Sequence, residues 1–355
     1  MLNNYRLRHT FTRNSDESIL DSVGRFRWSL VLFCLLSPIG CGCSADSKPG
    51  LLSSFGYHIG KTKVWYKNHE NGLEVYSVHQ VIGADAPTFR EKTFTNKQGT
   101  SQTLGVDAQH VFWGWELIEG ADLATFEYVG SGYFKDKNYA YSFANRLSED
   151  AANFELIGDF VRDSKNVYFA SSVFSDDAPN FQRVGPIESK YYRDSKRCWY
   201  FISPIAEADP NTIRSLGGNY AADQEHIFYE MNLLEGADQA TFQILPLEYS
   251  RDAIHVYYQS LPLEDAQADS FKVLNFRYSV DASRCYYYGF PIKDAAPLSF
   301  QVIDEYYTKD ASHVWINGTL IDGADPATFR VIQGPGGKSR DANYEYDMEQ
   351  RVGGK

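Results

Sequence analysis

The chain has 355 residues, a formal net charge of −12 and 15% aromatic residues. This length allows two or three domains or one long array of small units, and the aromatic content favours strands over helix bundles. Residues 1–40 hold five basic and three acidic side chains, so the rest of the chain has a net charge of about −14 and repels phosphate backbones. Nucleic acid is therefore excluded as an expected partner.

The N-terminal region carries a short apolar run behind a basic pair. Arg25 and Arg27 precede residues 28–39, WSLVLFCLLSPI, and small residues and Cys41 follow. A dozen apolar residues are too few for a membrane-spanning helix, which needs about 20, but they fit the apolar segment of a secretory signal. We therefore expect a signal region over residues 1–43 and a linker over residues 44–56. An apolar hairpin or helix within a soluble protein is the alternative interpretation.

The Gly40-Cys41 junction resembles the cleavage site of a bacterial lipoprotein, in which the cysteine is acylated and becomes the mature N-terminus. This resemblance implies lipid attachment at Cys41, with Cys43 as the alternative. It also implies a protein anchored to the membrane of the bacterial cell envelope, with a secreted or periplasmic protein as the alternative location.

From residue 57 onward one pattern recurs, and nearly every copy contains an aspartate in the same place. Nine such aspartates stand 27 to 31 residues apart, most often 29: Asp107, Asp136, Asp163, Asp194, Asp223, Asp252, Asp281, Asp310 and Asp341. Five residues after each of them stands an aromatic residue: Phe112, Tyr141, Tyr168, Trp199, Phe228, Tyr257, Tyr286, Trp315 and Tyr346. Consecutive bulky residues without helical spacing predict a buried strand, in a hairpin whose turn contains the aspartate.

Each copy continues with a tight turn, a second strand and a segment led by a second aspartate. Asn317-Gly318 stands between two apolar runs, and Asn-Gly tolerates the positive φ values of a tight hairpin. In residues 323–329, Asp325 followed by Pro predicts a single helical turn that delivers Phe329 into the core. A third strand, such as residues 330–332, leads towards the next aspartate. Each unit of about 29 residues is thus expected to hold three short strands and one helical turn.

These units predict an all-β fold with a tandem repeat array over residues 57–346 and a C-terminal tail over residues 347–355. We expect the units to stack into an elongated or curved solenoid-like array, with a closed β-propeller as the alternative. The first unit, residues 57–89, is atypical because it holds about ten extra residues around positions 68–79.

Two strings in the array resemble the DKNYY family of bacterial repeat proteins, namely residues 134–141, FKDKNYAY, and residues 162–169, RDSKNVYF. Members of this family are often predicted to be envelope proteins or lipoproteins, and their function is unassigned. The resemblance therefore implies a repeat architecture and an envelope location, and it implies no catalytic residue.

Residues that could carry chemistry mostly occupy repeat positions. Four histidines stand three residues after a repeat aspartate, which favours a place beside the turn over metal ligation: His110, His226, His255 and His313. Cys198 and Cys285 lie three units apart, which predicts two buried thiols rather than a disulfide. The adjacent Asp176 and Asp177 leave calcium as a weak alternative. We expect no catalytic residue, no cofactor and no metal site.

The expected function is that of a non-enzymatic, lipid-anchored envelope protein that presents an extended surface for binding or acts as a scaffold. Its expected partners are an envelope protein or a glycan, besides the membrane itself. Residues 68–79 and 91–102 depart from the repeat and are the candidate binding segments. A hydrolase with its site in the atypical N-terminal unit and a purely structural spacer are the alternatives.

Overall fold

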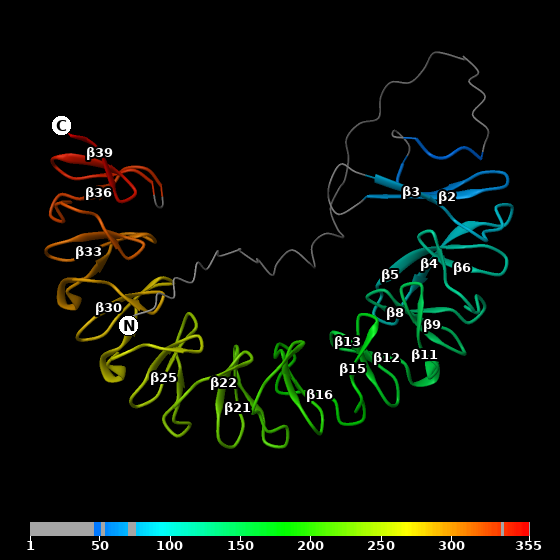
Figure 1. The fold of residues 1–355 in the computed structure, drawn as a ribbon, viewed down its shortest axis with the longest axis horizontal. Coiled ribbons are helices and arrows are strands. Elements are labelled where there is room, and N and C mark those ends of the chain that lie inside the picture. The colour runs from blue at the N-terminus through cyan, green and yellow to red at the C-terminus, as the bar shows by residue number, and fades with distance from the viewer. Residues whose placement is uncertain (1–45, 51–53, 70–75, 335–336, 355) are drawn as a thin grey trace, which may run out of the picture.

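The computed structural model describes residues 46–50, 54–69, 76–334 and 337–354. These residues form ten small antiparallel sheets that follow one another along an arc (Figure 1). The first sheet has three strands and each of the other nine has four. The predicted all-β tandem repeat is confirmed, and the described residues form neither a closed barrel nor a propeller.

Within every sheet, strands that are consecutive in the chain are neighbours. The first three sheets contain β1 (Gly56–Ile59), β2 (Val64–His69) and β3 (Tyr76–Gln80); β4 (Arg90–Thr95), β5 (Ser101–Val106), β6 (Val111–Trp113) and β7 (Glu116–Leu117); and β8 (Glu127–Gly130), β9 (Tyr133–Lys135), β10 (Ala140–Ser142) and β11 (Asn145–Ser148). The next three contain β12 (Glu155–Ile157), β13 (Phe160–Arg162), β14 (Val167–Phe169) and β15 (Ser172–Ser175); β16 (Gln182–Arg183), β17 (Tyr191–Arg193), β18 (Cys198–Tyr200) and β19 (Ser203–Pro204); and β20 (Arg214–Gly217), β21 (Tyr220–Ala222), β22 (Ile227–Tyr229) and β23 (Asn232–Leu233).

The last four sheets contain β24 (Gln243–Ile244), β25 (Tyr249–Arg251), β26 (Val256–Tyr258) and β27 (Leu261–Pro262); β28 (Lys272–Val273), β29 (Tyr278–Val280), β30 (Cys285–Tyr287) and β31 (Phe290–Pro291); β32 (Gln301–Val302), β33 (Tyr307–Lys309), β34 (Val314–Ile316) and β35 (Thr319–Leu320); and β36 (Arg330–Val331), β37 (Ser339–Arg340), β38 (Tyr344–Asp347) and β39 (Gln350–Gly354). Three connections between sheets contain 3-10 helices, which are η1 (Ala151–Asn153), η2 (Ala268–Ser270) and η3 (Pro297–Ser299).

Each repeat aspartate lies in the turn between the second and third strands of its sheet, as predicted. In the ninth sheet, β33 ends before Asp310 and β34 begins at Val314. The Asp310 backbone N–H donates to the His313 carbonyl at 3.0 Å, and its Oδ1 accepts the N–H groups of Ser312 and His313 at 2.7 Å. The short carboxylate thus satisfies the N–H groups that the turn leaves without a backbone partner.

The prediction of three strands per unit was wrong, because each complete sheet has four. In the ninth sheet, β32 and β33 are separated only by residues 303–306, so the tyrosine-rich sequence before Asp310 does not mark where one strand ends and the next begins. Residues 350–354, expected as part of a tail, form β39 and pair with β38 in the tenth sheet.

The predicted helical turn is a 3-10 helix in three of the connections and a hydrogen-bonded turn in others. In the turn at Asp325, the Oδ1 atom accepts the Ala327 N–H at 3.0 Å, as expected of a capping carboxylate. Asp150 before η1 makes no such bond and instead accepts the Ser164 N–H at 3.1 Å. The aromatic residue at the end of the turn is buried in most units, for example Phe154 and Phe329.

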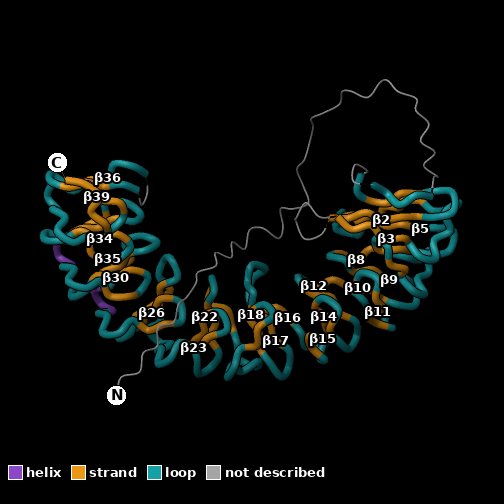
Figure 2. The backbone as a smooth tube through the Cα atoms, turned by 45° about the horizontal axis from the view of Figure 1, so that its top comes forward, coloured by secondary structure: helices purple, strands orange, loops and turns teal. Residues whose placement is uncertain are grey.

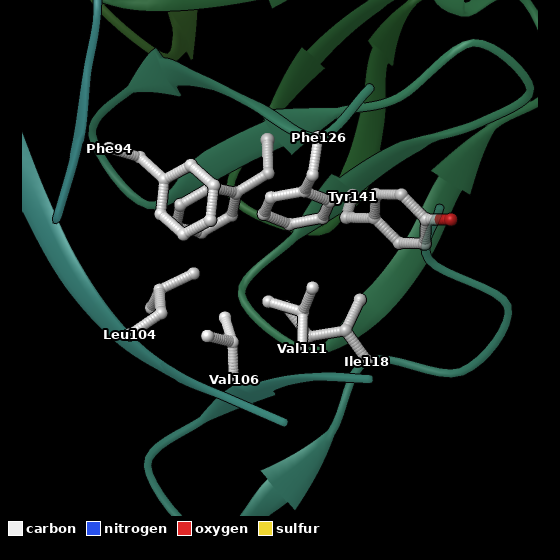
Figure 3. Packing of buried hydrophobic residues seen from close by; sticks show 8 residues of the cluster. Phe94, Leu104, Val106, Val111, Ile118, Phe126 and Tyr141 are labelled. Atoms are coloured by element: carbon white, nitrogen blue, oxygen red, sulfur yellow. The ribbon is translucent and has the colours of Figure 1, made fainter. Parts of the chain in front are cut away.

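The core is divided into nine clusters, and each is shared by two successive sheets. In the cluster of Figure 3, Phe94, Leu104 and Val106 of the second sheet face Phe126, which lies in the connection to the third sheet, and Tyr141 of the third sheet. All nine repeat aromatics, from Phe112 to Tyr346, are buried. The aromatic series is therefore an internal ladder that joins neighbouring units.

Tyrosine hydroxyls add a second connection between units. A tyrosine at the start of the second strand donates to a backbone carbonyl of the next sheet, about one repeat further along the chain. Tyr191 donates to the Asn219 carbonyl at 2.7 Å, and Tyr220 donates to the Glu248 carbonyl at 3.1 Å. Equivalent bonds join Tyr133, Tyr278 and Tyr307 to their neighbours.

The two ends of the strands lie on opposite sides of the arc. The coiled 3-10 turns are on the outer, convex side (Figures 1 and 2). The aspartate turns contact these connections: the Gln267 N–H, just before η2, donates to Asp281 Oδ2 at 2.9 Å. The opposite strand ends therefore lie on the concave side. We call their connections, between first and second and between third and fourth strands, the inner loops.

Residues 46–50, within the predicted linker, contact the first sheet. Asp46 Oδ1 accepts the N–H groups of Thr62 and Lys63 at 2.7 and 3.0 Å. The Lys67 Nζ donates to the Gly50 carbonyl at 2.9 Å. The described segment that precedes the array is thus fixed to the turn between β1 and β2.

Within the described part of the chain, no helix has the length and apolar character needed to cross a membrane.

Candidate functional site

The predicted lipid attachment sites, Cys41 and Cys43, lie outside the described residues. The two cysteines of the array are buried and free, as predicted. Burial raises the pKa of the Cys198 and Cys285 thiols to about 12, which keeps both protonated at neutral pH. Buried, protonated thiols pack as small apolar side chains, and the thiolate that would act as a nucleophile is disfavoured.

The carboxylates of the repeat aspartates are occupied by donors from the protein. Asp281 accepts the N–H groups of Ser283 and Arg284 at 2.7 Å and the Tyr286 hydroxyl at 2.7 Å, in addition to the Gln267 N–H. Burial opposes ionisation, but the hydrogen bonds from Tyr286, Gln267 and Ser283 hold the pKa of Asp281 below its usual value. The aspartate therefore fastens its turn to the connection on the convex side.

The four histidines lie beside these turns. The Nδ1 atoms of His110 and His255 are 3.1 Å from the carboxylates of Asp107 and Asp252. In the His110 turn, the position equivalent to Tyr286 is Phe112, which has no hydroxyl. The His110 imidazole contacts the Asp107 carboxylate there, whereas in the eighth sheet the Tyr286 hydroxyl donates to the Asp281 carboxylate. No group of three or more His, Cys, Asp or Glu side chains in the described ranges is arranged to hold a metal ion.

The adjacent Asp176 and Asp177 are also engaged by neighbouring groups. Asp176 pairs with Lys196 at 3.2 Å and with Arg197 at 3.6 Å, and Asp177 accepts the Ser195 N–H at 3.0 Å. Two cations beside the carboxylates oppose the binding of a further cation, so the structure offers no support for calcium here.

Apolar side chains are exposed along the inner loops. Phe143 and Ile202 are each 42% exposed, and Phe276 is 53% exposed. The first residue of the turn between third and fourth strands has a positive φ in all nine four-stranded sheets, from 48° at Tyr288 to 57° at Gln259. Bulky residues seldom adopt this conformation, so side chains such as Phe143 and Tyr288 are presented on the concave side at a conformational cost.

Aromatic and basic side chains join three units on the same side. The Tyr288 ring lies 6.1 Å from the Tyr258 ring and 5.8 Å from the Phe276 ring. The Arg277 guanidinium lies 4.4 Å from the centre of the Tyr306 ring and pairs with Glu305 at 3.0 Å. This inner cluster is one continuous patch over the seventh to ninth sheets.

A pocket of about 520 Å³ lies between the first two sheets, and we call it the N-terminal pocket. Its lining combines aromatic side chains with amides, a hydroxyl and two carboxylates: Phe55, Gly56, Tyr57, Tyr66, Asn68, Glu91, Gln102, Thr103, Leu104, Trp113, Gly114, Trp115 and Glu116. No lysine or arginine is among these described residues.

The walls of the N-terminal pocket are held by the repeat framework. The Tyr57 hydroxyl accepts the Gly105 N–H at 3.0 Å and donates to the Phe112 carbonyl at 3.2 Å. The Tyr66 and Trp115 rings are 6.1 Å apart and inclined by 43°. Gly114 has a φ of 56°, and a Cβ atom there would be 3.3 Å from the Tyr66 ring, so glycine lets this ring lie against the turn.

Two polar groups of this pocket are without protein partners. Among the described residues, neither the Tyr66 hydroxyl nor the exposed Glu91 carboxylate takes part in a hydrogen bond or ion pair. Burial, and then the nearby charge of Glu91, raise the pKa of Tyr66. The hydroxyl is thus protonated at neutral pH and can donate a hydrogen bond, and the carboxylate oxygens of Glu91 can accept one.

The sequence indicated part of this pocket. Asn68, Glu91 and Gln102 belong to the two segments expected to bind, although residues 70–75 lie outside the described residues. Trp113, Trp115 and Glu116 were missed because they stand in a regular repeat hairpin. The signal for them was the string Trp113-Gly114-Trp115-Glu116, which places a tryptophan on each side of the turn glycine.

Comparison with models of protein families matches the DKNYY family over residues 106–289, just over half of the chain. The matched part contains the aspartate turns from Asp107 to Asp281, and the ninth and tenth sheets continue the same strand order beyond it. No curated protein and no solved structure matches the chain.

Proposed function

Because the chain belongs to the DKNYY family, we propose that it is a non-enzymatic binding scaffold of the bacterial cell envelope. The units form a curved, solenoid-like array that is anchored to the membrane by a lipid on Cys41, with Cys43 as the alternative. The array presents an extended surface, and its partner is an envelope protein or a glycan.

The observation that carries this proposal is the contrast between the two sides of the arc. The convex side repeats one hydrogen-bonded motif, in which each aspartate turn is fastened to the connection before it, as at Asp281 and Asp310. The inner loops differ from unit to unit and expose apolar side chains, including the aromatic Phe143 and Phe276. Apolar side chains such as Ile254 and Leu298 are also exposed on the convex side, but they stand on the constant turns. A constant framework with variable exposed loops on one side is typical of repeat proteins that bind a partner.

The test is capture of partners from envelope extract by the immobilised array, residues 44–355. We expect a reproducible partner, and we expect Phe276→Ser to weaken its capture because this ring is exposed within the inner cluster. Leu298→Ser is the matched control, since Leu298 is fully exposed (101%) in η3 on the convex side. If no partner is captured reproducibly, the structural spacer becomes the better interpretation.

The lipid anchor has its own test, independent of the partner. Labelled fatty acid should be incorporated into the chain in a bacterial host, and Cys41→Ala should abolish the incorporation. If Cys41→Ala keeps the label and Cys43→Ala loses it, the lipid is attached at Cys43. If the original chain incorporates no label, the secreted or periplasmic location is favoured.

A hydrolase is the second candidate, because the N-terminal pocket contains two carboxylates, Glu91 and Glu116. A pair of carboxylates can divide the roles of general acid and general base. Hydrolysis of envelope glycans or peptides that Glu91→Gln abolishes would support this candidate. Activity that is equal in the variant and the original chain would discard it.

A further inference from the structure

We propose that the N-terminal pocket binds a small organic ammonium ion between its aromatic side chains and its carboxylates. The pocket includes one inner loop, at Gly114 and Trp115, but the inference goes beyond the proposed binding surface because a pocket between the first two sheets would hold a small ion instead of a macromolecular partner.

The charge of the lining selects a cation. Glu91 and Glu116 contribute two negative charges, and none of the described lining residues is basic. The chain as a whole is also acidic, with a net charge of −12. An anion would therefore be repelled at the pocket, whereas a cation gains from both carboxylates.

The aromatic side chains select an organic cation over a hydrated metal ion. Tyr66, Trp113 and Trp115 line the same pocket as the two carboxylates. The negative faces of such rings attract ammonium groups, and their apolar surface accommodates the alkyl substituents that these groups carry. Metal ions that prefer oxygen ligands require several oxygen atoms close together, and no such group of carboxylates occurs in the described residues.

The groups without protein partners define the contacts of the ligand. The Glu91 carboxylate can accept a hydrogen bond from an ammonium N–H or pair with a quaternary nitrogen. The Tyr66 hydroxyl lines the same pocket from the first sheet, whereas Glu91 lines it from the second, and this hydroxyl can donate to an oxygen of the ligand. A molecule such as choline, which joins a quaternary nitrogen to a hydroxyl, matches both groups at once.

The test is a calorimetric titration of the full chain, in a nonionic polyoxyethylene detergent, with choline chloride. The first comparison ligand is the dimethylbutanol whose two methyl groups are both on carbon 3 (3,3-dimethylbutan-1-ol). In this alcohol a carbon atom replaces the charged nitrogen of choline and the shape is nearly the same. The second is methyl glucoside, which has the hydroxyls of a sugar and no charge. We expect saturable binding of choline, and binding of both neutral ligands that is weaker by about tenfold or more.

Two variants locate the binding. Glu91→Gln removes one charge and keeps the size of the side chain, and we expect it to weaken choline binding by about tenfold. Glu119→Gln is the matched control, because Glu119 is exposed in the next connection and does not line the pocket. Both positions are exposed, so neither substitution should disturb folding.

Equal affinity for choline and dimethylbutanol, the absence of choline binding, or an equal effect of the two variants would overturn the proposal. Stronger binding of methyl glucoside than of choline would replace the ammonium ion by a neutral sugar. Partner capture by the Glu91→Gln variant separates this inference from the proposed function, since undiminished capture without choline binding would leave the scaffold role intact.

Discussion

Replacement of one buried repeat aspartate, Asp281→Ala, should destabilise the array at one place. The carboxylate accepts hydrogen bonds from the N–H groups of Gln267, Ser283 and Arg284 and from the Tyr286 hydroxyl. It is 3% exposed, so water cannot readily replace these bonds. Alanine would leave several donors in and around the turn without an acceptor.

The magnitude follows from the number and kind of these bonds. A hydrogen bond to a charged group contributes about 1.5–3 kcal/mol, and removal of one partner from a buried charged network costs about 3–5 kcal/mol. We expect a loss of about 4 kcal/mol for Asp281→Ala and of about 2 kcal/mol for Tyr286→Phe, which removes one donor only. Asp269→Ala in the same unit should change the unfolding free energy by less than about 0.5 kcal/mol, because Asp269 is exposed.

Hydrogen exchange followed by mass spectrometry is the suitable assay, with urea unfolding for the overall free energy. Each core cluster is shared by two successive sheets, so the loss of protection should be confined to the eighth sheet and its two neighbours. A cost of Asp281→Ala no larger than that of Asp269→Ala would refute the role of the carboxylate. Uniform loss of protection along the whole array would refute the local coupling.

Three further predictions concern other positions. Ala170 has a φ of 53°, so Ala170→Gly should raise the free energy of unfolding by about 0.5–1 kcal/mol, whereas Ala253→Gly, at a position without positive φ, should lower it. Urea midpoints that shift in the same direction for both variants would contradict this. Although burial of Asp341 opposes ionisation, hydrogen bonds lower its pKa from 3.8 to about 2. The stability that this carboxylate contributes should therefore be complete above pH 4 and be lost between about pH 4 and 2, and Asp341→Asn should flatten this part of an acid titration. The thiols of Cys198 and Cys285 should resist alkylation, followed by peptide mass spectrometry, until urea unfolds the array; rapid alkylation in the folded protein would show that they are accessible.

The repeat spacing and the aspartate turn could be predicted because both depend on local chemistry. The carboxylate of an aspartate readily accepts the N–H groups two and three residues later, as at Asp310, and Asn317-Gly318 adopts the expected positive φ values of 50° and 74°. Local preference could not predict the same turn at Phe143, because this residue disfavours a positive φ. There the Phe143 ring packs 5.2 Å from the Trp113 ring of the previous sheet, so contact between units opposes the local preference.

The N-terminal pocket was only partly predictable for a related reason. Glu91 could be predicted as a binding residue because its segment departs from the repeat, but Trp113 and Trp115 occupy ordinary repeat positions. What distinguishes them is the neighbour, since Tyr66 belongs to a first sheet that has only three strands. A sequence pattern gives the order of the strands, whereas a pocket depends on which side chains of two successive sheets face each other.

On a chain acylated at Cys41, as proposed, the contacts of Asp46 with the turn at Thr62 and Lys63 would limit how far the array can move from the membrane. Asp46 stands five positions after Cys41, and a fully extended chain spans about 17 Å over five such steps. On a chain acylated at Cys41 the first sheet is therefore tethered within about 20 Å of the bilayer surface. The N-terminal pocket would then sample the layer next to the lipid headgroups.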